Sequence, residues 1–361
     1  MKNPDIIYPK KPNKNTCAGA VCLSLGVLGE PSVSHEIELI QKRLKKDFNL
    51  KIKYMDNSLK GFEFLRAHPE AKSADLKQAF LDKDVEIIWS ALGGDDSFRT
   101  LPYLMDDEFQ EIVRQNPKPF LGFSDTTNTH LMLNAMGLAT FYAPALLSDI
   151  AELGPEIFPY TKEWLNKLFT GEKQIVLNSS PVWYKSRPSF GPDQLGIPCP
   201  EVKETHGHEY LYGEGVVEGP LLGGCLESLY EILAGGRYPD QLDVYTKFNI
   251  FPDTKKWQDK IIFLETSEEK PTPKKVQKML GTLESQGIFD VANGLIIGKP
   301  CDECYYEEYK DIFEKLAQKH HLPTVYNLNF GHSAPRMVLP YEKLMKIDFT
   351  KEEISLPEGL I

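Results

Sequence analysis

The chain has 361 residues, which is too long for one ordinary hydrophobic core and suits two domains of common size. Its formal net charge of -11 at pH 7 argues against a nucleic-acid-binding protein, because such a protein needs a basic surface to contact the phosphate backbone. The first twelve residues carry charges and three prolines where a secretory leader needs an apolar core, and no later run is long enough to span a bilayer. We therefore expect a cytoplasmic protein without nucleic-acid or membrane partners.

The first part of the chain alternates apolar, strand-like runs with helical stretches. The expected strands cover residues 18–28, 50–55, 85–92 and 119–123, and the expected helices cover 35–48, 74–82 and 98–105. Strands that are apolar on both faces and alternate with helices are typical of a parallel sheet covered by helices. The prediction is an N-terminal α/β domain over residues 1–170, with ligands collecting at the carboxyl ends of its strands.

The pattern changes in the second half. After a helix at 160–168, residues 173–209 show no clean period, so we expect an irregular connection or active-site loop over 171–209. A smaller, β-rich α/β domain follows over 210–361. Its expected strands are short glycine-punctuated runs over 213–222, then 260–264, 294–297, 324–330 and a terminal hairpin-like pair, and its expected helices cover 225–234, 273–286 and 306–320.

Ser124 lies where an apolar strand runs through Gly-Phe-Ser-Asp into a helix. A serine on such a turn is lifted clear of the sheet, and the amides that open the following helix point at whatever it attacks. The same residues also suit a helix cap without catalysis, so a base and an acid elsewhere must decide. A second turn of this kind, Gly93-Gly-Asp-Asp-Ser-Phe-Arg99, follows the strand over 85–92 and suits an oxyanion role better than a phosphate cradle.

The partners of Ser124 are expected in the second half of the chain. Glu265 ends a fully apolar strand on a carboxylate, which can hold an imidazole in the correct tautomer. His332 follows another apolar run beside a glycine and has the most site-like setting of the eight histidines. Ser124, Glu265 and His332 thus occur in the order nucleophile, acid, base, as in α/β-hydrolases, although no Gly-x-Ser-x-Gly is present.

Metal-binding interpretations compete with this one. Cys301-Asp-Glu-Cys304 is a C-x-x-C pair, but zinc or an iron–sulfur cluster would need a second pair, and the spacing of Cys17 and Cys22 differs. The pair His206-Gly-His208 has only loosely spaced acidic neighbours. A metal at either place stays open as the lesser alternative. The six cysteines are expected to be free thiols, and no cofactor is predicted.

These motifs resemble the serine LD-carboxypeptidases, including the branch similar to microcin C immunity proteins. The resemblance spans roughly residues 16–350 in family order. It is carried by Ala91-Leu-Gly-Gly-Asp-Asp-Ser97, Gly122-Phe-Ser-Asp-Thr-Thr127, Thr140-Phe-Tyr-Ala-Pro-Ala-Leu146, Gly219-Pro-Leu-Leu-Gly-Gly-Cys-Leu226, Phe263-Leu-Glu-Thr-Ser267 and Gly331-His332.

The resemblance implies a role for each residue of the site. Ser124 is the nucleophile, His332 the general base and Glu265 its orienting acid, while the backbone amides of Gly94 and Asp125 hold the oxyanion. It implies an N-terminal domain similar to class I glutamine amidotransferases, a site across the domain interface, and a homodimer. It also places Asp95 among the substrate-binding residues.

Departures from the family pattern bear on the substrate. In the immunity branch a loop carries two tryptophans seven residues apart, one of which packs on a nucleoside. Trp183 matches the first tryptophan, and Phe190 stands in the place of the second. Stacking of a nucleoside base should be weaker here, because an indole offers a larger face than a phenyl ring. Alternatively, both residues only anchor their loop. Cys225 replaces a common asparagine, and Glu342 replaces a common glycine.

The expected substrate is a small peptide or peptidyl nucleotide, cleaved through an acyl-enzyme. A murein tetrapeptide in cell-wall recycling is the alternative substrate, and a non-catalytic small-molecule binding protein is the alternative class.

Overall fold

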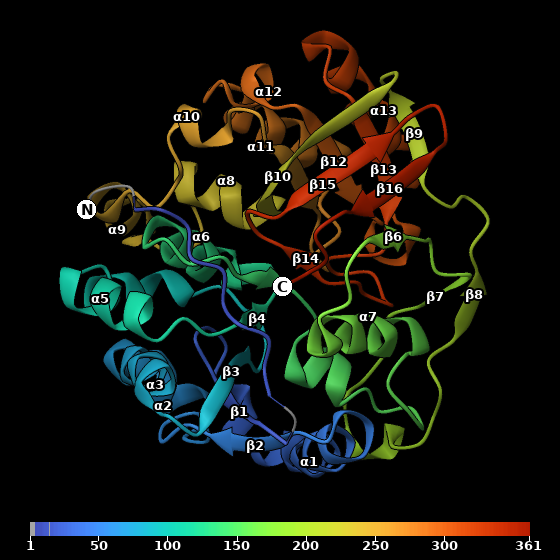
Figure 1. Cartoon of the computed structure of the whole chain (residues 1–361). Coiled ribbons are helices and arrows are strands. Elements are labelled where there is room, and N and C mark those ends of the chain that lie inside the picture. Colours follow the sequence, from blue (N-terminus) through green and yellow to red (C-terminus); the bar gives the residue numbers. More distant parts are fainter. Residues whose placement is uncertain (1–3, 14) are drawn as a thin grey trace.

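The computed structural model of the chain describes residues 4–13 and 15–361. Two sheets dominate it, one above the other in Figure 1, with the first part of the chain below and the later part above. The lower sheet has the strand order β14-β5-β4-β3-β1-β2, and all its neighbours run parallel except β14 and β5. Its strands are β1 (Cys17–Val21), β2 (Lys51–Tyr54), β3 (Val85–Ser90), β4 (Phe120–Gly122), β5 (Phe141–Tyr142) and β14 (Leu339–Pro340).

Helices cover both faces of this sheet. Phe169 of α7 (Pro159–Thr170) touches Phe48 of α1 (Ser34–Phe48) and Trp89 of β3, so α1 and α7 share one face. Phe80 of α3 (Pro69–Leu81) meets Phe109 of α5 (Asp107–Gln115) on the other. The other α-helices of this half are α2 (Phe62–Ala67), α4 (Leu101–Leu104) and α6 (Thr127–Ala135). The predicted parallel α/β arrangement is confirmed.

The upper sheet has the strand order β6-β16-β15-β10-β11-β12-β13-β9. Its centre, from β10 to β13, is parallel, and its flanks are antiparallel. The strands are β6 (Ile175–Leu177), β9 (Glu209–Tyr212), β10 (Val216–Cys225), β11 (Ile261–Glu265), β12 (Gly294–Gly298), β13 (Thr324–Leu328), β15 (Leu344–Asp348) and β16 (Glu353–Leu356). The helices are α8 (Leu226–Ala234), α9 (Gln241–Phe248), α10 (Thr254–Trp257), α11 (Pro273–Glu284), α12 (Ile288–Val291) and α13 (Tyr306–His320).

Several expectations about single elements were wrong. The strand expected over 18–28 ends at Val21, because the chain turns there into short helical turns. The expected glycine-punctuated strands over 213–222 are one ten-residue strand, β10, whose glycines allow close approach. A Cβ at Gly223 would lie 1.9 Å from the carbonyl oxygen of Phe263. The region 173–209 contains β6, which pairs with the distant β16, and β7 (Val182–Tyr184) and β8 (Glu201–Lys203), which pair with each other.

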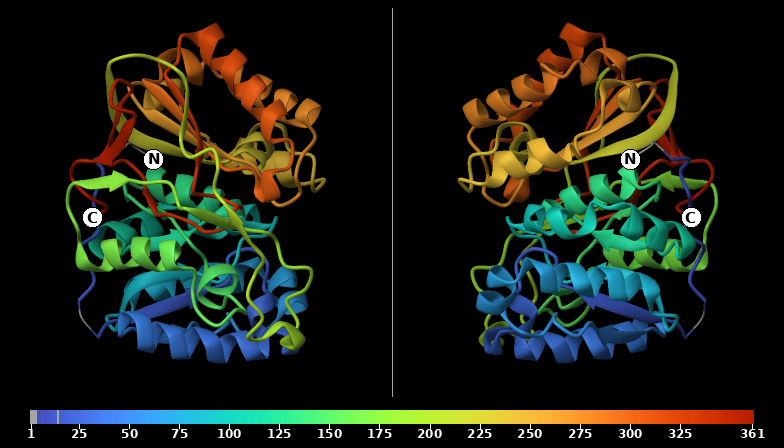
Figure 2. Two further views of the ribbon diagram at one scale, coloured as in Figure 1. Left: turned by 90° about the vertical axis from the view of Figure 1, so that its right-hand side faces the viewer. Right: turned by 90° about the vertical axis from the view of Figure 1, so that its left-hand side faces the viewer.

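The two sheets exchange their edge strands. β6 completes the upper sheet and β14 completes the lower one, so the chain crosses between the two halves several times. The segment with β7 and β8 runs along one side of both halves (Figure 2). Between the sheets, the ring of Phe263 in β11 packs on Tyr142 and Tyr341 at 5.3 and 5.1 Å. Glu265 is two residues further along β11 and therefore points to the same face.

In residues 4–13 and 15–361, no helix combines the length and the apolar character that crossing a membrane requires.

Candidate active site

Ser124 stands on a strained turn between the lower sheet and α6. Its φ is 65°, in the left-handed region that a non-glycine residue adopts at a cost of about 1–3 kcal/mol. The Thr127 hydroxyl donates to the carbonyl oxygen of Ser124 at 2.7 Å and fastens the turn. Gly93 comes so close that a Cβ there would lie 2.8 Å from Ser124 Oγ. The hydroxyl is therefore raised at the carboxyl edge of β4, and the neighbouring turn leaves room for it.

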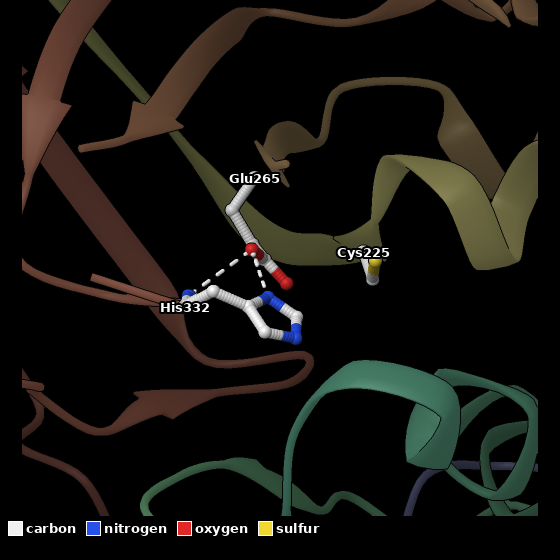
Figure 3. Close-up of side chains that lie close together, drawn as sticks. All are labelled: Cys225, Glu265 and His332. Atoms are coloured by element: carbon white, nitrogen blue, oxygen red, sulfur yellow. Dashed lines mark hydrogen bonds and ion pairs between the residues drawn. The ribbon is translucent and has the colours of Figure 1, made fainter. Parts of the chain in front are cut away.

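Glu265 and His332 reach Ser124 from the upper half of the molecule. The His332 Nε2 atom lies 3.0 Å from Ser124 Oγ, and its Nδ1 atom lies 2.7 Å from Glu265 Oε2. The backbone amide of His332 donates to the same carboxylate oxygen at 3.2 Å. Figure 3 shows the Glu265 side chain pointing at the imidazole, with both contacts dashed. The structure thus joins the three predicted residues in one hydrogen-bonded chain.

A glycine beside the histidine makes this approach possible. Gly331 has a φ of 86°, and a Cβ on it would lie 2.4–2.5 Å from three atoms of the Glu265 side chain. The Arg336 guanidinium donates to the carbonyl oxygen of His332 at 2.9 Å and to Asp149 at 2.7 Å. The loop that carries His332 is therefore held from both sides.

Tyr142 is a site residue that the sequence reasoning missed. Its hydroxyl donates to Glu265 Oε1 at 2.5 Å and accepts from the backbone amide of Ser124 at 3.0 Å. The ring is buried between the two sheets and so links the acid to the turn of the nucleophile. Tyr142 lies in Thr140-Phe-Tyr-Ala-Pro-Ala-Leu146, one of the motifs that carry the family resemblance. Its place in that motif is the feature of the sequence that could have identified it as a site residue.

A buried polar network holds the two turns where the oxyanion amides are expected. The Asp125 carboxylate accepts from the Ser24 hydroxyl at 2.5 Å and from the Ser97 amide at 2.9 Å. Burial raises the pKa of Asp125, and these hydrogen bonds oppose that rise. Gly94 has a φ of 144°, and a Cβ there would lie 2.4 Å from Ser24 Oγ. In this turn Gly93 and Gly94 carry no side chain, Asp96 and Ser97 are buried, and only the Asp95 side chain is half-buried, so the backbone at Gly93 can come close to Ser124.

The three expected substrate-binding residues lie in different settings. Asp95 follows Gly94 directly, and its carboxylate is 3.8 Å from Arg237. Trp183 is only 3% exposed, and the Lys299 ammonium lies 5.2 Å from the centroid of its ring. Phe190 is 58% exposed, and its carbonyl oxygen lies 3.2 Å from His35 Nε2. Of the two aromatic residues, Phe190 presents its ring to solvent.

A further carboxylate reaches the histidine. Glu268 Oε2 lies 2.9 Å from His332 Nε2. Burial disfavours the charged imidazolium, but Glu265 and Glu268 outweigh burial and raise the pKa of His332 to about 10. The hydrogen bond with His332 in turn lowers the pKa of Glu268 to about 2, against burial. The site in this state is therefore an imidazolium between two carboxylates.

The site also brings together residue types that bind metals elsewhere. In the described part of the chain, only Cys225, Glu265 and His332 form a group with ligand atoms within 4.8 Å of one another. Two of them are already hydrogen-bonded to each other, and burial followed by the charge of Glu227 raises the pKa of the Cys225 thiol well above its usual value. Because a metal needs the thiolate, the arrangement fits a hydrogen-bonded triad better than a metal site. The Cys301 and His206 motifs join no such group in that part of the chain.

Comparison with known proteins places this geometry in a family. The model of the LD-carboxypeptidase N-terminal domain matches residues 19–143, and that of the C-terminal domain matches residues 218–347. The chain belongs to the LD-carboxypeptidase family. A solved structure of a MccF-like protein from Streptococcus pneumoniae in complex with AMP is 43% identical, with a TM-score of 0.89 over 94% of this chain and 98% of that one.

Two curated relatives are more distant LD-carboxypeptidase homologues. The microcin C7 self-immunity protein MccF of Escherichia coli is 27% identical over 292 residues, which are 80% of this chain and 78% of that protein. A probable murein peptide carboxypeptidase of Bacillus subtilis is 26% identical over 286 residues, covering 77% and 73% of the two chains. The family is that of peptidases, which makes hydrolysis of an amide bond the shared chemistry.

Proposed function

We propose that the protein is a serine amidohydrolase that cleaves a small peptide or peptidyl nucleotide through an acyl-enzyme. The observation that carries the proposal is the unbroken hydrogen-bonded chain from Ser124 through His332 to Glu265. Ser124 and His332 come from different halves of the molecule, 208 residues apart in sequence. A cap without catalysis would not need a buried histidine and carboxylate to converge on the serine.

The chemistry follows from the roles of the three side chains. Neutral His332 takes the proton of Ser124 Oγ through Nε2 while the oxygen attacks the amide carbonyl. The amides of Gly94 and Asp125 are proposed to hold the oxyanion. His332 then passes the proton to the leaving nitrogen as the C–N bond breaks. A water molecule, deprotonated by the same imidazole, hydrolyses the ester and releases Ser124.

Glu265 keeps the imidazole ready for both proton transfers. It accepts from Nδ1 and from the backbone amide of His332, so the ring presents Nε2 to Ser124. Tyr142 neutralises part of the remaining charge of the carboxylate by donating to its other oxygen. The acid thus orients the base and stabilises the imidazolium that forms during attack.

The peptidyl-nucleotide substrate is supported by the relatives and by Phe190. The Streptococcus pneumoniae relative was solved with AMP, and MccF was solved with aspartyl sulfamoyl adenosine. A tryptophan-to-phenylalanine variant of MccF was solved with adenosine monophosphate. The exposed ring of Phe190 offers a face on which a base can stack, whereas Trp183 packs on Lys299 and acts as an anchor of its loop.

The substrate is tested by offering two compounds to the purified protein. An aminoacyl sulfamoyl adenosine and a muropeptide tetrapeptide are incubated with the protein and with Ser124→Ala, and products are identified by mass spectrometry. Cleavage of the adenosine compound by the parent protein alone supports the proposal. Cleavage of the tetrapeptide alone assigns the chain to murein recycling, the alternative that the Bacillus subtilis relative suggests by name.

Phe190→Ala tests the stacking surface. The variant should raise KM for the adenosine compound about tenfold or more, since a base on an aromatic face contributes about 1–3 kcal/mol. An unchanged KM would remove Phe190 from the nucleotide site.

If the parent protein and Ser124→Ala bind the adenosine compound equally well and the parent turns over neither substrate, the chain would instead be a binding protein. The expected homodimer and cytoplasmic location stay predictions.

A further inference from the structure

The Nε2 atom of His332 has two partners that require opposite protonation states. Ser124 Oγ lies 3.0 Å from it, and Glu268 Oε2 lies 2.9 Å from it. To receive the proton of Ser124, Nε2 must carry no hydrogen. To hold a carboxylate at hydrogen-bond distance, it must carry one, since two lone pairs facing each other repel. The contact with Glu268 therefore describes a resting state, and catalysis requires that this carboxylate leave.

Glu268 is the partner that is free to move. Its side chain is 68% exposed, whereas those of His332 and Glu265 are 7% and 0% exposed. In the described part of the chain, the only ion pair of its carboxylate is with His332. Its neighbours along the segment 266–272 are tied to separate partners: Ser267 to Glu227, Glu269 to Arg237, and Lys270 to Asp302. The backbone amides of Ser267, Glu269 and Lys270 are hydrogen-bonded as well, so the backbone is held on both sides of Glu268 while its side chain lies in solvent.

The surroundings of His332 are mainly acidic. The titratable or charged groups around it are Glu265 of β11, Cys225 at the end of β10, Glu227 of α8, Glu268, Cys301 of the turn Cys301–Glu303, and Arg336. The cation among them, Arg336, is paired with Asp149. Nearby, Arg237 is shared by the carboxylates of Asp95, Glu231 and Glu269. The exposed carboxylate of Glu268 lies beside the nucleophile, and the acidic side chains around it make the local potential negative. Such a place favours the binding of a positively charged group of a ligand.

We propose that Glu268 receives a cationic group of the substrate, an ammonium next to the scissile carbonyl, and thereby releases His332 to act as the base. The inference rests on the proposed hydrolase function and narrows the acyl part of its substrate to a single aminoacyl group with a free α-amino group, because the α-nitrogen beside the scissile carbonyl of a longer peptidyl group is an uncharged amide. Once Glu268 pairs with the ammonium, the Nε2 proton of the imidazolium passes to water. In this step one N–H bond of the imidazolium breaks and one O–H bond forms on the water molecule, and no other covalent bond changes.

The geometry of attack makes the two events compatible. In a productive complex the carbonyl carbon lies about 3–3.5 Å from the attacking oxygen. The α-ammonium is bonded to the carbon next to this carbonyl. It therefore lies within reach of Glu268, whose carboxylate and the Ser124 hydroxyl both contact Nε2 of His332. The raised pKa of His332, about 10, agrees with a resting imidazolium that is a poor base at neutral pH until one carboxylate is withdrawn.

The first experiment measures the resting contact without any substrate. Histidine imidazoles of the full-length protein are followed by NMR from pH 5 to 11, with His332 assigned from the spectrum of His332→Gln. Glu268→Gln should lower the midpoint of His332 by more than one pH unit. The matched control is Glu284→Gln, which removes a carboxylate from a different histidine. Glu284 is the last residue of α11, and its carboxylate lies 2.6 Å from Nε2 of His320, the last residue of α13. Glu284→Gln should leave the titration midpoint of His332 where it is in the parent protein. If the midpoint of His332 is also unchanged in Glu268→Gln, the proposal is overturned.

The second experiment measures recognition of the ammonium. Alanyl sulfamoyl adenosine and its N-acetyl derivative are compared as substrates by kcat/KM across pH. The parent protein and Glu284→Gln should prefer the free amine at least tenfold. Glu268→Gln should reduce that preference to less than threefold and move the acid limb of the profile to lower pH. An undiminished preference in Glu268→Gln would contradict the proposed role.

A failure of the proposed function is recognised separately. If neither compound is hydrolysed, binding of the two compounds to Ser124→Ala and to Ser124→Ala with Glu268→Gln is measured by calorimetry. The free amine should bind about tenfold more weakly when Glu268 is replaced, and the N-acetyl compound should not change. Equal binding of the free amine to both proteins would overturn the inference, whatever the outcome for hydrolysis.

Discussion

Replacement of Glu265 by glutamine probes the site with the smallest change of shape. The carboxylate accepts three hydrogen bonds, two from His332 on Oε2 and one from Tyr142 on Oε1. A glutamine amide has one oxygen and one NH2 group, so it can satisfy only one side. If the oxygen faces His332, the NH2 group meets the Tyr142 hydroxyl, whose proton then has no acceptor. If it faces Tyr142, the NH2 group meets the amide and the Nδ1–H of His332.

Either orientation damages catalysis, because the imidazole loses its tautomer or its position relative to Ser124. Losing the orienting acid of a triad lowers kcat by about 10³–10⁴, which corresponds to about 4–5.5 kcal/mol of transition-state stabilisation. One unsatisfied buried donor also lowers the free energy of unfolding by about 1–3 kcal/mol. Initial rates with the adenosine compound measure the first effect, and urea denaturation measures the second.

Two comparisons make the result decisive. Glu284→Gln removes a carboxylate from another histidine and should keep full activity. Glu265→Gln placed in Ser124→Ala should cause no further loss, because the members of a triad act as a unit. A folded Glu265→Gln protein with kcat within tenfold of the parent would refute the role of Glu265 as the orienting acid.

Three further changes test other contacts of the site. Gly93→Ala places a Cβ 2.6 Å from Ser124 Cβ, so kcat should fall at least a hundredfold while the melting temperature, measured by calorimetry, changes by only a few degrees. Tyr142→Phe leaves the Ser124 amide and Glu265 Oε1 each without a partner, so urea denaturation should show a loss of about 1–3 kcal/mol, together with a lower kcat. The pKa of His332 is raised from 6.5 to about 10, so its stabilising contribution is complete below pH 6.5 and is lost as the pH rises through about 10. Urea titrations at pH 6, 8 and 10 should show this decline in the parent protein and a flatter profile in His332→Gln.

Each of these has a clear contrary result. An active Gly93→Ala protein would mean that the turn at 93–97 does not confine the nucleophile. A Tyr142→Phe protein as stable and active as the parent would make the link through the hydroxyl irrelevant. Equal pH dependence of unfolding in the parent and in His332→Gln would show that His332 does not titrate as inferred.

Local patterns in the sequence predicted the parts of the site that depend on one element each. Ser124 follows an apolar strand at a glycine-containing turn, and Glu265 ends another apolar strand, so the period and the end of each strand marked them. The order of the three residues then agreed with a hydrolase. The structure adds the distances, which no local pattern contains.

The parts that were missed depend on contacts between the two halves. Tyr142 lies in a strand of two residues, too short for any period, and its hydroxyl meets Glu265 only because β5 and β11 are packed across the interface. Glu268 looks like any exposed acid in sequence, and its importance arises from the position of His332. The exchange of β6 and β14 between the sheets was missed for the same reason, since three-residue and two-residue strands are stabilised by their neighbours.

The central claim is that Ser124 is a nucleophile activated by His332. A fluorophosphonate, which reacts with activated serine hydroxyls, is incubated with the full-length protein, and the labelled peptide is identified by mass spectrometry. We expect a single adduct on the peptide that contains Ser124, no adduct in Ser124→Ala, and labelling at least a hundredfold slower in His332→Gln. Labelling of a different residue, or equal labelling rates with and without His332, would contradict the claim.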